Sequence, residues 1–134
     1  MRILVADDDP TYRTLLQGLL ETMHFDVLLA ENGTEALEML GRPNGPELAI
    51  LDFMMPGLDG YEVCRQIRQT KGDEVPYVIL MTGSIHRNDL TRVLVAGADD
   101  YLLKPFEPMD LKIRLRTALR ILGLLSQRQP AASL

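Results

Sequence analysis

Short apolar runs and longer amphipathic segments alternate five times along this chain. The short runs are typical of β-strands, and three of them are almost wholly apolar, as expected for parallel strands covered on both faces. The expected strands are Ile3–Ala6, Asp26–Ala30, Leu48–Leu51, Tyr77–Met81 and Tyr101–Leu103. Between them, apolar residues recur at intervals that predict helices. The whole pattern therefore predicts an α/β domain built on a parallel sheet.

The starts of the expected helices carry capping residues. Asp9 is followed by Pro10, a residue suited to the first helical position, and Asn32 precedes Glu35 in a pair that resembles a capping box. The remaining boundaries are expected at Asp59, Gly97 and Pro108. With right-handed crossovers, five such units predict a flavodoxin-like three-layer (βα)5 sandwich with strand order 2-1-3-4-5.

Polar side chains stand at the ends of the strands that would border the ligand crevice of this fold. Asp7 and Asp8 follow the first strand, Asp52 the third, Thr82 the fourth and Lys104 the fifth. In open α/β sheets, ligands bind at the carboxyl ends of the strands, where the strand order reverses. The convergence of these strand ends on one set of charged and hydroxyl groups therefore predicts a functional site.

The acidic residues of this predicted site suit a magnesium ion. Carboxylates that lie close together resist ionising together, and a hard cation with oxygen ligands relieves that repulsion. Asp8 and Asp52 are the expected direct ligands, Asp7 a ligand through a water molecule, and Met54 a source of a backbone carbonyl. Zinc is not expected, because the sequence has no cluster of cysteines and histidines.

The same residues suit the transfer of a phosphoryl group. A carboxylate such as that of Asp52 can attack phosphorus and form an acyl phosphate. This chemistry needs stabilisation of negative charge more than covalent help. The ammonium of Lys104 and the hydroxyl of Thr82 can supply that stabilisation beside a bound cation.

Composition and charge narrow the classes of function. With 134 residues, of which 46% are hydrophobic and 25% charged, the chain is expected to form one soluble domain with its own core. A net charge of −5 argues against nucleic-acid binding. The single cysteine, Cys64, fits a reducing compartment. We read no signal peptide and no apolar span, so a cytoplasmic protein that does not enter a membrane is expected.

Four stretches of the chain resemble the receiver domains of two-component response regulators. They are ILVADDDP, LDFMMPGLDG, LMTG and GADDYLLKPF, in the order and spacing of that family. The resemblance implies that Asp52 is the phosphoacceptor, phosphorylated in a Mg²⁺-dependent reaction by a sensor histidine kinase or a phosphotransfer protein. The other implied site residues are Asp7, Asp8 and Met54 for the metal, Thr82 and Lys104 for the phosphoryl group, and Tyr101 as the aromatic switch residue. The domain would be a signalling switch and not an enzyme, although it would catalyse its own phosphorylation and dephosphorylation. A cis bond between Lys104 and Pro105 is also implied.

The resemblance also implies an output surface, formed by the fourth helix, the fifth strand and the fifth helix. Phosphorylation would change this surface and so control a downstream protein or an output domain. Similar receivers form homodimers through it, and Asp100 and Arg114 could pair across such an interface. One departure is Leu90, which stands where those receivers usually carry a basic residue.

The C-terminal part of the sequence leaves two readings open. The receiver domain is expected over residues 1–126, and residues 127–134 are expected to be a flexible tail or the start of a linker. A stripe with heptad-like spacing is formed by Leu111, Leu115, Ala118, Leu122 and Leu125. The favoured reading packs this stripe on the sheet, and the alternative continues its later part as a connecting helix. A run of basic residues in the same region is read as a solvated helix face: Lys112, Arg114, Arg116, Arg120 and Arg128.

Three other functions compete with the phosphorylation switch. A receiver could signal by binding alone, but the intact set of site residues argues against this. A phosphohydrolase with an aspartyl nucleophile would typically need a second acid two residues after Asp52, where Met54 stands. A flavin-binding module of the same fold would need a phosphate-binding loop after the first strand, and the acidic residues there would repel phosphate.

Overall fold

Five strands and five helices alternate along the described part of the chain. The computed structural model describes the backbone of residues 1–83 and 87–132, and the side chains of residues 1–83 and 90–127. The strands are β1 (Arg2–Ala6), β2 (Asp26–Ala30), β3 (Leu48–Asp52), β4 (Tyr77–Thr82) and β5 (Asp100–Leu103). The helices are α1 (Pro10–Thr22), α2 (Gly33–Gly41), α3 (Gly60–Lys71), α4 (Arg87–Ala96) and α5 (Pro108–Ala132).

The strands form one parallel sheet in the order β2-β1-β3-β4-β5, as the sequence predicts. Strand β1 lies between β2 and β3, with Ile3 opposite Val27 on one side and Leu48 on the other. The strand order reverses between β1 and β3, which places the crevice of the fold beside their carboxyl ends.

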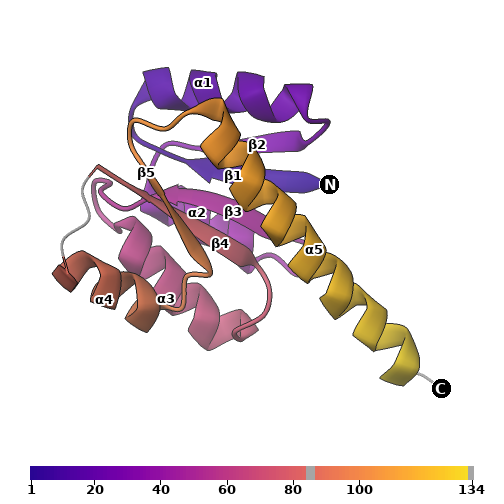
Figure 1. The fold of residues 1–134 in the computed structure, drawn as a ribbon. Helices are drawn as coiled ribbons and strands as arrows, with labels where there is room; N and C mark the ends of the chain where they lie inside the picture. Colours follow the sequence, from indigo (N-terminus) through magenta and orange to yellow (C-terminus); the bar gives the residue numbers. More distant parts are fainter. Residues whose placement is uncertain (84–86, 133–134) are drawn as a thin grey trace.

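Each face of the sheet is covered by helices, because successive side chains of a strand point to opposite faces. Leu4 and Ala6 of β1 belong to the core under α2, α3 and α4, and Ile3 and Val5 belong to the core under α1 and α5 (Figure 1). All four of these side chains are fully buried. The apolar β1, β3 and β4 therefore form the middle layer of a three-layer sandwich.

The helices begin where their capping residues predict. The carboxylate of Asp9 accepts a hydrogen bond from Thr11 N at 2.9 Å, and the side chain of Asn32 accepts one from Glu35 N at 2.9 Å. Asp59 likewise accepts from the backbone N–H of the third residue of α3, at 2.8 Å. Asp9 is thus a helix cap, although it is the third of three consecutive acids.

Helix α5 uses its apolar stripe to cover the sheet. The first four members, from Leu111 to Leu122, are buried in the core shared with α1, and Leu125 packs against that core. This confirms the favoured reading of the stripe. The helix continues to Ala132, well past the body of the domain (Figure 1). A flexible tail or linker beginning at residue 127 stays a prediction.

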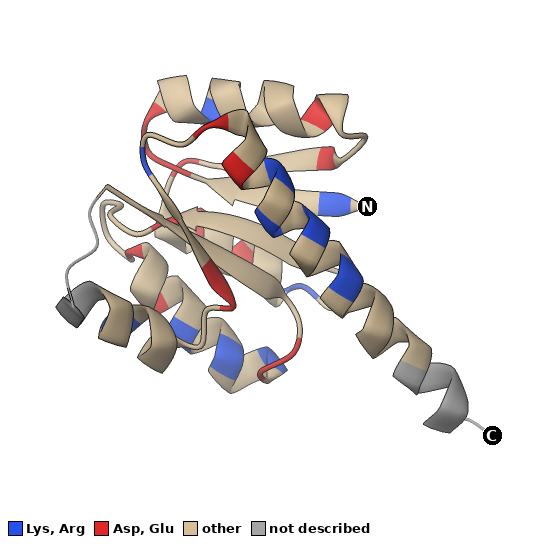
Figure 2. Cartoon of the chain, in the orientation of Figure 1, with Lys and Arg blue, Asp and Glu red and all other residues tan. Residues whose placement is uncertain are grey.

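Basic residues recur along α5 (Figure 2). Lys112, Arg116 and Arg120 are exposed and Arg114 is partly buried, which agrees with a solvated helix face; the side chain of Arg128 lies outside the described residues. Although α5 is long, no helix of the described residues combines the length and the apolar character that crossing a membrane requires.

Candidate functional site

The carboxyl ends of four strands bring the predicted site residues to one rim of the sheet. Asp52 ends β3, Thr82 ends β4, and Lys104 follows β5. The Lys104 ammonium lies 2.8 Å from Asp7 Oδ2 and 3.3 Å from Asp52 Oδ1. Residues that lie 97 positions apart in the sequence therefore form one charged cluster, as the strand order requires.

Three carboxylates make the acidic half of this cluster. One oxygen each from Asp7, Asp8 and Asp52 lie within 4.8 Å of one another. Asp7 is fully buried, Asp52 is 8% exposed, and Asp8 is open to solvent. Magnesium prefers oxygen ligands and usually keeps several waters, so a cluster with one solvent-exposed side suits this ion. Because the donors are all carboxylate oxygens, the residues fit the cation that the sequence predicts.

The pKa values of Asp52 and Lys104 are both shifted by the charges of the site. Burial, and after it the neighbouring Asp7 carboxylate, raise the pKa of Asp52 from 3.8 to about 6, although the Lys104 ammonium opposes both effects. Burial lowers the pKa of Lys104, but the carboxylates of Asp7 and Asp52 outweigh it and raise that pKa. The lysine is therefore held as a cation, and among the described residues its ammonium is the cationic group in contact with the carboxylates of Asp7 and Asp52. A site of this kind has a deficit of positive charge that a divalent cation can fill.

Two features that the sequence did not reveal hold Asp7 in place. The backbone N–H of Asp9 donates to Asp7 Oδ1 at 2.9 Å, and Arg13 Nη1 donates to the Asp7 carbonyl at 2.7 Å. Arg13 lies on α1 and also approaches Glu31, with 3.8 Å between Nη2 and Oε1. Nothing in the local pattern distinguishes Arg13 from a surface residue of an amphipathic helix, and its role depends on how α1 returns over β1.

Glycine allows α3 to begin directly against the end of strand β3. A Cβ atom added to Gly60 would lie 2.3 Å from the Asp52 carbonyl oxygen and 3.2 Å from a methyl carbon of Leu80. The Gly60 N–H also donates to the Phe53 carbonyl at 3.0 Å. The first residue of α3 is therefore in backbone contact with the segment that carries Asp52.

We expect Gly60→Ala to lower the free energy of unfolding by about 1 to 3 kcal/mol, since the backbone of Asp52 must move to admit the methyl group. Gly18→Ala is the matched control, because that glycine is exposed on α1 with nothing within 4 Å. The control should be neutral or stabilising, because alanine is the better helix former. Urea denaturation measures both, and equal stability of the two variants would contradict a tight contact at Gly60.

The remaining predicted residues lie around the cluster. Thr82 is partly buried at the end of β4, and its carbonyl accepts from Lys104 N at 2.8 Å. Tyr101 is partly buried in β5, and Arg114 Nε donates to its carbonyl. Met54 is 70% exposed, whereas Met55 is buried in the core. The Lys104–Pro105 bond is cis, as the resemblance implies.

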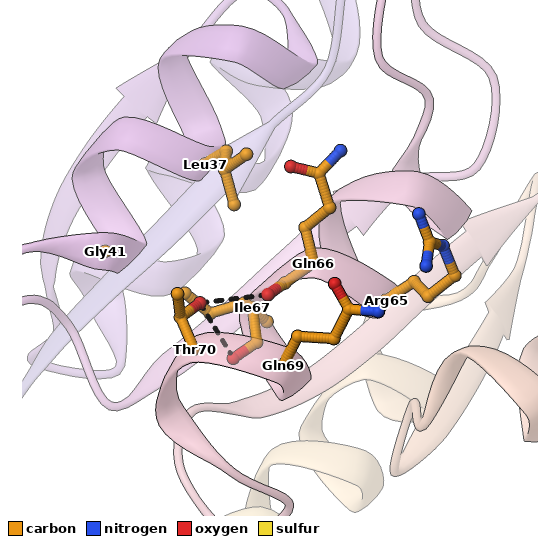
Figure 3. A pocket seen from close by; sticks show the side chains of 7 residues that line it. All are labelled: Leu37, Gly41, Arg65, Gln66, Ile67, Gln69 and Thr70. Carbon is orange, nitrogen blue, oxygen red and sulfur yellow. Dashed lines mark hydrogen bonds between the residues drawn. The ribbon is translucent and has the colours of Figure 1, made fainter.

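A separate groove of about 310 Å³ lies between α2 and α3 (Figure 3). Its lining residues are Leu37, Gly41, Arg65, Gln66, Ile67, Gln69 and Thr70. The Thr70 hydroxyl donates to the Gln66 carbonyl of its own helix at 2.9 Å, so this hydroxyl is not presented to a ligand. None of the lining residues belongs to the acidic cluster, and the groove is therefore not part of the candidate site.

Comparison with known proteins agrees with the geometry. The model of the family described as "Response regulator receiver domain" matches residues 3–116. The response regulator MprA of Mycobacterium leprae is 47% identical over 120 residues, which cover 90% of this chain and 51% of that protein. A putative response regulator from Chloroflexus aurantiacus has a similar crystal structure, with a TM-score of 0.81, 33% identity, and coverage of 89% of this chain and 97% of that chain.

A third similar protein bears on the metal. It is the receiver domain of the sensor histidine kinase PA1611 from Pseudomonas aeruginosa, whose crystal structure is described as having a magnesium ion coordinated in the active site cleft. Its TM-score is 0.78 at 31% identity, with coverage of 91% of this chain and 97% of that chain.

The chain spans about half the length of the curated relatives that it matches. Within that span, the family match runs from the first strand into the fifth helix and includes every residue of the charged cluster. The chain therefore belongs to the receiver domains of two-component response regulators.

Proposed function

We propose that Asp52 accepts a phosphoryl group in a Mg²⁺-dependent reaction and that its phosphorylation switches the domain between two states. The observation that carries this proposal is the position of Asp52 itself. Its carboxylate is buried, yet it lies 3.3 Å from the Lys104 ammonium and beside two further carboxylates. Such an arrangement provides a nucleophile together with the ligands for a charge-neutralising ion.

In the proposed reaction, one Asp52 oxygen attacks the phosphorus atom of a phosphorylated donor. A new P–O bond forms to Asp52, and the bond from phosphorus to the donor breaks. That bond is P–N when a histidine kinase or phosphotransfer protein donates, and P–O when the donor is acetyl phosphate. The protein's main contribution is to hold positive charge and hydrogen-bond donors around the phosphoryl oxygens.

The neighbours of Asp52 have two roles in the proposed reaction, which are to hold the metal ion and to stabilise the phosphoryl oxygens. Asp8 and Asp52 would hold Mg²⁺ directly, Asp7 through water, and the Met54 carbonyl would complete the protein ligands. When bound, the ion neutralises charge on the phosphoryl oxygens and the carboxylates. Lys104, already placed against Asp52, turns its ammonium toward a phosphoryl oxygen, and the Thr82 hydroxyl can donate to another.

Incubation with acetyl phosphate and Mg²⁺, followed by intact mass measurement, tests the proposal. We expect a mass gain of one phosphoryl group that is absent without Mg²⁺ and absent in Asp52→Asn. Asp9→Asn is the matched control, because the Asp9 side chain caps α1 and a cap of asparagine preserves that role. If the wild-type protein forms no adduct, or Asp52→Asn forms it equally, the proposal is wrong. The absence of any adduct would favour a receiver that signals by binding alone.

The switch is proposed to run from Thr82 to Tyr101. A phosphoryl group brings about −1.5 to −2 of charge and three acceptor oxygens, which can draw the Thr82 hydroxyl toward Asp52. Thr82 pairs with Leu103 in the sheet, two residues beyond Tyr101 on the neighbouring strand. Movement of the threonine would vacate space that the Tyr101 ring can fill, and this would change the surface formed by α4, β5 and α5.

We expect Thr82→Ala to accept the phosphoryl group but to lose most of the conformational response, because the drawn hydroxyl is absent. Backbone amide chemical shifts of α4 and β5, recorded with and without beryllofluoride, measure that response. The matched control is Thr117→Ala on α5, whose hydroxyl donates to the Ile113 carbonyl of its own helix at 3.2 Å. A full set of shift changes in Thr82→Ala would exclude the proposed route.

The partners follow from the same proposal. A sensor histidine kinase or phosphotransfer protein would supply the phosphoryl group, and an output domain or a downstream protein would respond to it. The curated relatives are about twice as long as this chain, which supports an output domain in proteins of this kind.

A homodimer through α4, β5 and α5 is proposed as one output. Exposed apolar side chains on these elements support it: Leu90, Leu94, Leu103 and Ile113 are 37%, 76%, 43% and 55% exposed. Arg114 already approaches Asp100 of the same chain, with 3.8 Å between Nε and Oδ1, so a pair across the interface would have to replace this contact. Light scattering with and without beryllofluoride tests the dimer. A molecular mass that is unchanged by beryllofluoride would contradict phosphorylation-linked dimerisation.

A further inference from the structure

The Lys104 ammonium has a neighbour that is not a carboxylate. Its Nζ lies 4.1 Å from the centre of the Tyr12 ring, above the face of that ring. Tyr12 is partly buried on the first turns of α1, close to the acidic end of β1. The ammonium therefore has carboxylates on one side, at 2.8 and 3.3 Å, and an aromatic face on another.

The Tyr12 ring is itself held by the loop that carries the lysine. The ring centres of Tyr12 and Phe106 are 6.2 Å apart, with the ring planes inclined by 42°. Phe106 packs against the core shared by α1 and α5. Lys104 and Phe106 lie two residues apart on either side of Pro105, so a single loop contacts Tyr12 through both of them.

We propose that Tyr12 is a positioning residue, which holds the Lys104 ammonium ready for the phosphoryl group. This inference rests on the proposed phosphorylation of Asp52. A lysine ammonium is a strongly hydrated point charge on a flexible stem, and many rotamers would take it away from Asp52. The electron-rich ring face attracts the ammonium and replaces water on one side of it. Its N–H groups then remain available to the carboxylates and to an arriving phosphoryl oxygen.

The contact between the Tyr12 ring and the Lys104 ammonium has a consequence that ordinary packing would not have. Because the ammonium can turn from Asp52 toward a phosphoryl oxygen without leaving the ring, the ring lowers the cost of ordering the lysine in the phosphorylated state. It should not affect the carboxylate cluster in the same way, because the contacts of Tyr12 that we describe are with Lys104 and Phe106. Tyr12 therefore acts on the reaction only through Lys104.

Three variants test the inference through the rate constant of phosphorylation by acetyl phosphate, measured by intact mass. Tyr12→Leu should lower this rate constant by between about threefold and thirtyfold, the range expected for loss of a partly desolvated cation–π contact. Tyr12→Phe keeps the ring and should retain the wild-type rate constant within about twofold. In a Lys104→Met background, Tyr12→Leu should cause no further loss, because the contact is already absent.

Two further measurements distinguish positioning from structure. The Mg²⁺ affinity of Tyr12→Leu should stay within about twofold of wild type, because the described contacts of the ring are with Lys104 and Phe106 and not with the expected metal ligands. In NMR spectra, the ring current of Tyr12 should shift the ε-methylene protons of Lys104 upfield, in wild type and Tyr12→Phe but not in Tyr12→Leu. This shift is observable whether or not the protein is phosphorylated.

The outcomes separate this inference from the proposed function. An additive loss in the Lys104→Met background, or equal losses of Mg²⁺ affinity and rate, would show that Tyr12 merely packs and would overturn the inference. Absence of the ring-current shift in a wild-type protein that is phosphorylated would also overturn the inference, and would leave the function of Asp52 intact. A wild-type protein that shows the shift but forms no adduct would overturn the proposed function, and with it the role of the contact in that reaction.

Discussion

Lys104→Met is expected to lower the free energy of unfolding by about 3 to 5 kcal/mol in Mg²⁺-free buffer at about pH 8. The ammonium is the cation that lies between the buried carboxylates of Asp7 and Asp52, and its side chain is only 14% exposed. Methionine fills a similar volume but removes the ammonium that contacts both acids. Removing one partner of a buried ionic cluster is far more costly than losing an exposed ion pair.

Three comparisons identify the cause of that loss in denaturation experiments. Saturating Mg²⁺ should restore much of the stability, because the ion supplies the missing charge. A second replacement, Asp52→Asn, should also restore part of it by removing one of the uncompensated acids. Lys112→Met, at an exposed position of α5, is the matched control and should change stability by less than about 0.5 kcal/mol. A Lys104→Met protein as stable as this control would mean that the cluster does not need its ammonium.

The raised pKa of Asp52 gives a related pH dependence. Because burial and Asp7 raise this pKa from its ordinary value of 3.8 to about 6, ionising the carboxyl opposes folding. The contribution of the protonated Asp52 carboxyl to the free energy of unfolding is therefore complete below about pH 4. It is lost as the pH rises through about 6, and the total loss is about 3 kcal/mol. The advantage of Asp52→Asn over wild type should thus grow as the pH rises from about 4 to about 6 without Mg²⁺, level off above that, and disappear with Mg²⁺. A difference that is constant with pH would contradict the shift.

Arg68→Met should cost a comparable amount, about 3 to 5 kcal/mol, at the opposite end of the sheet. The Arg68 side chain is 6% exposed. Its Nη2 lies 2.8 Å from Asp99 Oδ2, and its Nε donates to the Gly97 carbonyl at 2.9 Å. The same carboxylate oxygen accepts from Val78 N at 2.8 Å. The arginine therefore fixes the end of α4 and the start of β5 to α3.

The matched control lies three positions earlier on the same helix. Arg65 pairs with Glu62 at 2.6 Å, but both side chains are partly exposed to solvent, so Arg65→Met should cost far less stability than Arg68→Met. Guanidinium chloride would screen these charges, so urea is the better denaturant for this comparison. Equal losses for the two variants would show that burial does not set the value of the Arg68 contacts.

The arrangement of strands and helices could be predicted because each element has a recognisable local pattern of apolar and capping residues. The wholly apolar run at residues 48–51 is typical of a strand covered on both faces, and β3 is buried at all five of its positions. The caps Asp9, Asn32 and Asp59 mark helix starts in the sequence and occupy those positions in the structure. Strand ends were less certain, and β3 and β4 each extend one residue further, to include Asp52 and Thr82.

Contacts between side chains that lie far apart in the chain could not be predicted from the sequence. Arg13, Tyr12 and Arg68 each look like ordinary residues of an amphipathic helix, because their partners lie on other elements. The exposed apolar positions of α4 and α5 were likewise not distinguished from core positions by spacing alone. Burial depends on which side of each helix meets the sheet, and that is decided by the packing of the whole domain.

The strand order, the carboxyl-terminal rim and the set of groups that meet there can be predicted from the local pattern of the chain, because parallel strands joined by right-handed crossovers have few arrangements. How those groups share charge depends on the packed domain. The tertiary structure set Lys104 at 2.8 Å from Asp7 and 3.3 Å from Asp52, and it placed the Tyr12 ring against the ammonium. The physical reason is that electrostatic and ring contacts depend on distances of a few ångströms and on burial, and both are properties of the packed chain.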